Sequence, residues 1–97
     1  MKKLLLLLIL FFHLLLELHA QMVYIPDSAF RQKLIILGMS ACLTGDSIDP
    51  ACFQVQNRNT LDVSNASIHN LQGIQVFTNL SSLKCNYNPG LTIPALP

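Results

Sequence analysis

The sequence predicts an α/β fold in which a short capping helix is followed by the first one to two coils of a repeat solenoid. Three observations lead to this expectation. One amphipathic segment covers residues 28–37, and two similar apolar blocks begin 22 residues apart, at Leu61 and Leu83. Between the blocks, apolar residues recur at every third position, as Leu71, Ile74, Phe77 and Leu80.

The first 20 residues are set apart from the rest. Lys2 and Lys3 precede an apolar run over residues 4–12, and the segment ends in polar residues and the small Ala20. This order is typical of a secretory signal peptide over residues 1–20 that is cleaved after export. We therefore expect a secreted or cell-surface protein with no membrane contact after cleavage.

An uncleaved membrane anchor is the alternative interpretation of the same segment. Such an anchor needs about 20 predominantly apolar residues to cross the hydrocarbon core. His13 interrupts the apolar run and Glu17 lies near its end. Both residues favour the cleaved signal.

The segment after Ala20 carries no net formal charge, so it has no basic stripe for nucleic acid and no polybasic patch for anionic lipid. We expect no nucleic-acid partner and no cofactor. Its basic residues are Arg31, Lys33, Arg58 and Lys84, and its acidic residues are Asp27, Asp46, Asp49 and Asp62.

Three cysteines remain after export to a compartment in which disulfides persist. Cys42 and Cys52 bracket a polar loop that Gly45 and Pro50 allow to fold back. A disulfide between them would stabilise the fold by about 2–3 kcal/mol. Cys85 lies at an apolar inward position, where we expect a buried free thiol.

A metal site is the competing interpretation of these residues. The cysteines do not have C-x-x-C spacing, and His69 has no partner at a ligand-like interval. Asp46, Ser47 and Asp49 suggest a calcium loop, but no glutamate follows them. Because Asp and Ser in a Gly/Pro loop are typical turn formers, we expect no metal.

Residues 21–58 are predicted to form an amino-terminal cap. A β-prone run, Val23–Ile25, ends at Pro26, and Asp27 or Ser28 can begin a helix over residues 28–37. Gly38 can end this helix.

The predicted helix has one apolar face. Phe30, Leu34 and Leu37 share this face with Ile35 beside them, whereas Arg31, Gln32 and Lys33 face away. A helix this short does not persist alone in water, so its apolar face must cover a neighbouring element.

Residues 59–97 are predicted to contain the repeats. The segment Leu80-x-x-Leu83-x-Cys85-x-x-Asn88-x-x-Leu91 matches the leucine-rich-repeat pattern, with one extra residue before the last leucine. Its L-x-L part predicts a short strand whose apolar side chains point into the core, and Asn88 turns the chain. One coil cannot bury its apolar face alone, so neighbouring coils must stack.

The first block departs from the repeat pattern. Arg58 stands where a leucine is expected, and Ala66 stands where the asparagine is expected. Terminal repeats are often atypical because one side meets a cap. We interpret residues 61–80 as a first, degenerate coil and Leu83 onward as the second, with the pattern broken off at Pro97, which suggests a truncated repeat segment.

The sequence resembles the internalin-like leucine-rich repeats of secreted bacterial proteins. Val23-Tyr-Ile-Pro-Asp-Ser-Ala-Phe30 is similar to their amino-terminal opening, and Leu61-Asp-Val-Ser-Asn65 and Leu83-Lys-Cys85 are similar to their strand motifs. The connecting segment of the family resembles residues 71–80. The resemblance implies a right-handed solenoid on or outside the cell.

Leucine-rich-repeat proteins bind through the concave strand face. We therefore expect a non-enzymatic protein that binds a protein or glycan ligand at the cell surface, and a segment that mainly caps the solenoid. The alternative for the outward residues is plain solvated surface. The expected contact residues are Asp62, Ser64, Lys84 and Asn86.

Two other functions stay open at the level of sequence: a small, self-contained, disulfide-stapled secreted protein, and the amino-terminal part of a larger exported enzyme. Asp62, Ser64, Ser67 and His69 lie close together in the sequence. They lack a nucleophile elbow and oxyanion glycines, so we expect no catalytic residue among them.

Overall fold

The structure is a computed structural model that describes residues 21–92. The predicted signal peptide, residues 1–20, lies outside the described residues, as do residues 93–97 of the predicted repeat segment. None of the helices in the described part combines the length and the apolar composition needed to cross a membrane.

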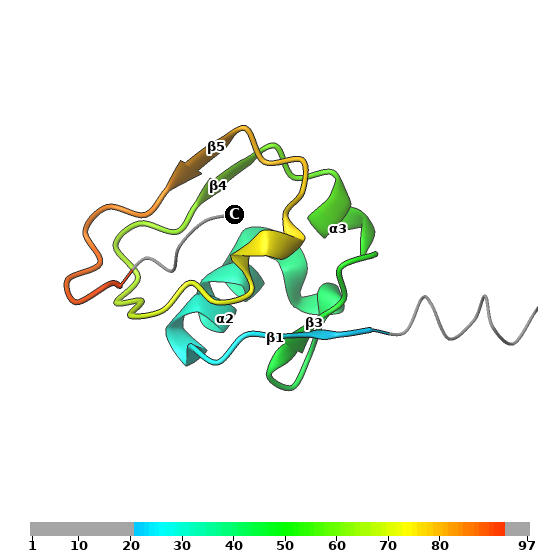
Figure 1. Ribbon diagram of the computed structural model, residues 1–97, viewed down its shortest axis with the longest axis horizontal. Coiled ribbons are helices and arrows are strands. Elements are labelled where there is room, and N and C mark those ends of the chain that lie inside the picture. Colours follow the sequence, from blue (N-terminus) through cyan, green and yellow to red (C-terminus); the bar gives the residue numbers. More distant parts are fainter. Residues whose placement is uncertain (1–20, 93–97) are drawn as a thin grey trace, which may run out of the picture.

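The amino-terminal half combines short helices with a small antiparallel sheet (Figure 1). In this sheet β3 is the central strand and pairs with both β1 and β2. The elements are β1 (Val23–Tyr24), α2 (Ser28–Leu34), the π-helical turn η1 (Ile35–Met39), the 3₁₀ turn η2 (Ser40–Cys42), β2 (Leu43–Thr44), β3 (Ser47–Ile48) and α3 (Phe53–Gln56).

Helix α2 begins where the sequence predicts. Asp27 is its N-cap, and the backbone N–H of Phe30 donates to Asp27 Oδ1 at 2.9 Å. The α-helical part ends at Leu34, three residues before the predicted end at Leu37, and continues as η1. Gly38 in this turn has φ +94°, a conformation that glycine adopts without steric cost, so the helical path breaks there.

The predicted faces of the helix are partly correct. Phe30 and Leu34 are fully buried, as expected. Ile35 is 41% exposed and does not join the buried face, because the backbone changes to the wider π turn at this residue. Arg31 is half-buried, and its Nη1 donates to the Ile25 and Pro26 carbonyls instead of facing solvent.

The carboxy-terminal half contains a parallel strand pair. Strand β4 (Thr60–Asp62) and strand β5 (Ser82–Lys84) run side by side, with Leu61 opposite Leu83 (Figure 1). The connection between them includes the 3₁₀ turn η3 (Ile74–Val76). The predicted strands at the two apolar blocks are therefore confirmed.

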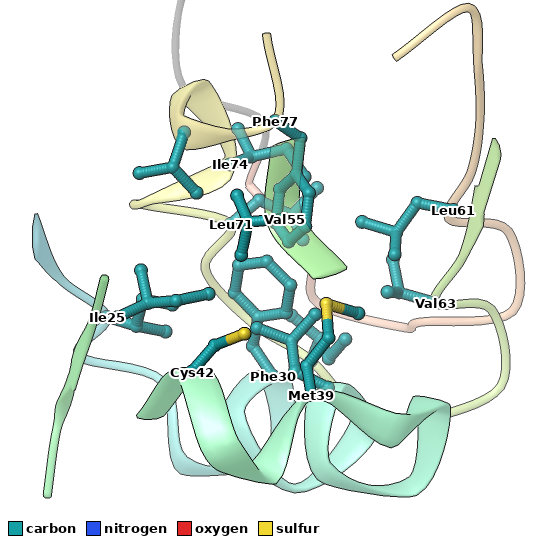
Figure 2. Packing of buried hydrophobic residues seen from close by; sticks show 14 residues of the cluster. Ile25, Phe30, Met39, Cys42, Val55, Leu61, Val63, Leu71, Ile74 and Phe77 are labelled. Carbon is teal, nitrogen blue, oxygen red and sulfur yellow. The ribbon is translucent and has the colours of Figure 1, made fainter. Parts of the chain in front are cut away.

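One apolar core joins the two halves. In Figure 2, the Phe30 ring extends from its helix toward Leu71 and Val55, which belong to the same buried cluster. The expectation that the helix covers a neighbouring element is thus confirmed. Other buried members are Ile25, Leu34, Met39, Cys42, Ile48, Leu61, Val63, Ile68, Ile74, Val76 and Phe77.

The Gly73 backbone lies close against Tyr24 and Ile25 of the amino-terminal half. It has φ +102°, and a Cβ placed on it would lie 2.6 Å from Ile25 Cγ1. Any side chain at this position would push β1 and the segment before η3 apart. The whole is a small mixed helix/strand domain compatible with the α/β class, and residues 21–92 do not by themselves show a solenoid.

Candidate ligand-binding face

The outward side chains of the β4/β5 pair form the candidate site. We call Asp62, Ser64, Lys84 and Asn86 the strand face. Strand residues alternate between two sides, so Leu61 and Val63 enter the core while their neighbours point outward. Asp62, Lys84 and Asn86 are exposed, and Ser64 is half-buried.

The parallel register brings the two strands of this face together. Asp62 is the direct partner of Lys84. The Val63 N–H donates to the Lys84 carbonyl at 2.8 Å, and the Asn65 N–H donates to the Asn86 carbonyl at 3.0 Å. The four predicted residues therefore form one continuous surface, and their binding role stays a prediction.

Asp62 is held in place by Ser64. Asp62 Oδ1 accepts the Ser64 N–H at 3.1 Å and also the Ser64 hydroxyl. The hydroxyl bond and then the backbone bond lower the pKa of Asp62 most. Desolvation raises the pKa in part, and the positive charges of Lys84 and Lys33 lower it by smaller amounts. Asp62 is therefore a carboxylate at neutral pH.

Two hollows lie on this part of the surface. One has a volume of about 340 Å³ and lies over the strand pair, lined by Thr60, Leu61, Asp62, Ser82 and Lys84. The other, of about 330 Å³, lies between α2 and the turn after β4, and is lined by Ala29, Gln32, Lys33, Ile36, Asn65 and Ala66.

Asn88 connects the two apolar blocks behind the strand face. Its Oδ1 accepts the Ala66 and Ile68 N–H groups at 3.0 and 3.1 Å. Its Nδ2 donates to the Val63 carbonyl at 2.9 Å and to the Cys85 carbonyl at 2.8 Å. The sequence predicts only that Asn88 turns the chain, and the structure adds the bonds to the preceding block.

Asp27 connects the two halves of the domain through hydrogen bonds that the sequence does not predict. Besides capping α2, its Oδ2 accepts the backbone N–H groups of His69 and Asn70 at 2.8 and 3.0 Å. Desolvation raises the pKa of Asp27, but the hydrogen bonds from His69, Phe30 and Asn70 outweigh it and lower the pKa below 3.8. No local pattern signals this role, because the donors follow 42 and 43 residues later.

The predicted disulfide is confirmed. Cys42 and Cys52 are bonded, with Cα atoms 5.6 Å apart, and close the loop that contains β2 and β3. Inside the loop, Asp49 Oδ1 accepts the Ala51 N–H at 2.9 Å, a turn bond of the expected kind. Between residues 21 and 92, no group of three or more His, Cys, Asp or Glu side chains could hold a metal ion.

Cys85 corrects an expectation. It is a free thiol, as predicted, but it is half-buried and not buried. The reason is its place directly after β5, at the side of the strand pair that no other described element covers. Leu80, Leu83 and Leu91 are half-buried for the same reason.

The uncovered side of β5 is also hollowed. Ile74, Phe77, Leu80 and Leu83 contribute to the lining of a mostly apolar hollow of about 430 Å³. The bond from Val63 N–H uses the carbonyl of Lys84, so in a parallel ladder the backbone groups of Leu83 point to the opposite edge. This edge is free among the described residues.

Asp62, Ser64 and His69, which lie close together in the sequence, are not joined into a catalytic triad by hydrogen bonds within residues 21–92. Asp62 bonds Ser64, whereas the His69 backbone bonds Asp27, and no hydrogen bond in residues 21–92 joins His69 to Asp62 or Ser64.

No protein-family model matches the chain, and neither a curated protein nor a solved structure matches it.

Proposed function

We propose that this chain is a non-enzymatic, secreted or cell-surface protein of the leucine-rich-repeat type. Its amino-terminal half caps a solenoid, and the strand face binds a protein or glycan. The observation that carries the proposal is the parallel pairing of β4 and β5, which are 22 residues apart in sequence and are joined by Asn88.

The same offset continues outside the strands. The Ser81 N–H donates to the Asn59 carbonyl at 2.7 Å, before the strands, and the Thr92 N–H donates to the His69 carbonyl at 3.0 Å, after them. Asn70 and Thr92 form a parallel bridge. A second block that follows the first over this length is what stacked coils require, because each coil contacts only its neighbours.

The two sides of the strand pair differ in how well they are covered. On the β4 side, α2 and its core residues belong to the same buried cluster as Leu61 and Val63, and in Figure 2 the Phe30 ring extends toward Leu71 and Val55 of that cluster. On the β5 side, the apolar hollow and the free strand edge are uncovered among the described residues. A free edge and apolar core invite aggregation unless another unit covers them. This asymmetry supports a capped first coil that is followed by further coils.

The intact mass of the native product, with and without reduction, tests the solenoid. A mass well above the 10.8 kDa of this chain is the expected result, because further coils add mass. A mass equal to residues 21–97 would contradict it. The Cys42–Cys52 disulfide would then favour the alternative, a small self-contained stapled protein.

Binding through the strand face is tested with arrays of peptides and glycans. We expect at least one ligand class to bind, and the variant with Asp62, Ser64, Lys84 and Asn86 all changed to Ala to lose that binding. The matched control is Thr78→Ala, an exposed residue after η3. Equal binding by the fourfold variant, with an unchanged melting temperature, would contradict the proposal.

A further inference from the structure

We infer, on the basis of the proposed function, that the ligand of the strand face is an acidic peptide segment that lies across β5, β4 and the adjoining side of α2. Two lysines on this surface carry the inference, one from each half of the domain. These are Lys84 in β5 and Lys33 in α2.

The carboxylates of the domain do not neutralise these lysines by hydrogen bonding. Each carboxylate accepts hydrogen bonds from backbone N–H groups or from serine hydroxyls, and none of these bonds comes from a lysine or an arginine. The four carboxylates of residues 21–92 are Asp27, Asp46, Asp49 and Asp62.

The surface is locally positive although the segment after Ala20 is formally neutral. Lys84 and Lys33 both lie near enough to Asp62 for their charges to lower the pKa of its carboxyl group. Two ammonium groups therefore accompany one carboxylate, whose Oδ1 is already occupied by Ser64. An anionic ligand gains more from this surface than a cationic one.

The shape of the surface favours an extended chain. The hollow over the strand pair contains Asp62 and Lys84, and the hollow beside α2 contains Lys33 and Asn65. Residues 62–65 connect the two hollows without a break in the chain. A ligand that contacts both lysines must cross this connection.

The chemistry between the lysines favours a peptide over a glycan. Hydroxyl and amide groups, from Ser64, Asn65 and Asn86, can donate to or accept from a peptide backbone. Neither of the two hollows is lined by an aromatic side chain, so between the lysines there is no ring on which a sugar could stack; the exposed ring of Tyr87 lies outside both linings.

The test measures binding of two labelled synthetic peptides to the secreted protein by fluorescence anisotropy at low and physiological salt. One peptide alternates Glu and Ser, and the other alternates Lys and Ser. We expect the Glu peptide to bind more tightly, and its affinity to fall with salt, because exposed charges are screened.

Single substitutions give the sharper test. Lys84→Gln and Lys33→Gln should each weaken binding of the Glu peptide about two- to fivefold, the range of an exposed ion pair. Asp62→Asn should strengthen it, because one repulsive charge is removed. The matched control is Asp46→Asn, an exposed carboxylate in the disulfide loop, which should leave the affinity unchanged.

Equal affinity for the two peptides, or an affinity that neither Lys84→Gln nor Asp62→Asn changes, would overturn the inference. A neutral glycan whose binding is lost in Asn86→Ala but kept in Lys84→Gln would overturn it and leave the proposed function standing. If strand-face variants affect no ligand at all, the proposed function fails with it.

Discussion

Among single residues, Asp27 makes the most far-reaching contacts. One carboxylate oxygen caps α2 and the other accepts the N–H groups of His69 and Asn70, in the segment between β4 and η3. Desolvation raises its pKa, but the backbone hydrogen bonds lower it overall. Because the folded pKa lies below the unfolded one, the carboxylate stabilises the fold above its ordinary value of 3.8. This stability is lost as the pH falls through the folded pKa.

We therefore expect Asp27→Asn to lower the free energy of unfolding at neutral pH by about 1–3 kcal/mol, because an amide nitrogen cannot accept the N–H groups. The free energy of unfolding should also fall less steeply as the pH decreases into the acid range, because the variant has no carboxyl group at this position to be protonated. Urea unfolding between acid and neutral pH measures both effects. Asp46→Asn is the control, and equal behaviour of the two variants would refute the role of Asp27.

Asn88 gives a second prediction at this scale. Its buried amide serves four backbone groups besides its weaker bond to Asn86, and Asn88→Ala would leave these groups without their partner. We expect the free energy of unfolding of this variant to fall by about 2–4 kcal/mol. Each buried polar group left unpaired costs about 1–3 kcal/mol, and some of these groups will bind water instead. Asn86→Ala, at an exposed position, should change thermal stability by less than about 0.5 kcal/mol. Similar losses in both variants would show that the Asn88 bonds contribute little.

Among the elements, α2 with η1 presents a matched pair of apolar residues. Phe30 is fully buried, whereas Ile36 is 73% exposed. Phe30→Asp should sharply reduce the soluble secreted yield, because it places a charge in the core between the two halves. Ile36→Asp should leave the yield close to that of the parent chain. Immunoblots of the secreted fraction compare them, and an unchanged yield for Phe30→Asp would show that α2 does not cap the coil.

How far the elements follow from sequence depends on the range of their contacts. The start of α2, its buried Phe30 and Leu34, and the strands at Leu61 and Leu83 result from local patterns, and the structure confirms them. The β-prone run Val23–Ile25 is also confirmed, as β1. The π turn at Ile35, the strands β2 and β3 and their pairing with β1 depend on tertiary packing, which overrides local propensity for such short segments. Two-residue strands are too short to produce a periodic pattern in the sequence.

The candidate site follows the same rule. Alternation along a strand predicted which side chains point outward, so Asp62, Lys84 and Asn86 were found. The position of Lys33 beside Asn65 does not follow from the sequence, because it depends on how α2 packs against the segment after β4. The second role of Asp27 was missed for the same reason.

For the whole molecule, the continuous core means that the amino-terminal half and the β4/β5 pair should unfold together. The Cys42–Cys52 loop lies in the amino-terminal half, but buried Cys42 belongs to the same cluster as Leu61 and Val63. A change confined to this loop should therefore be transmitted to the carboxy-terminal half through the packing, in one cooperative transition.

The double variant Cys42→Ser/Cys52→Ser tests this coupling. We expect its free energy of unfolding to fall by about 2–3 kcal/mol, because without the disulfide the loop has more conformational freedom in the unfolded chain. Hydrogen exchange of the Val63 and Ile68 amides, which lie in the carboxy-terminal half, should accelerate by the factor that corresponds to that loss, because we expect these amides to exchange through global opening. Cys85→Ser, outside the loop, is the control. If these amides keep their protection while those of the amino-terminal half lose theirs, the two halves are separate folding units, and the amino-terminal half would then cover the strand pair without stabilising it.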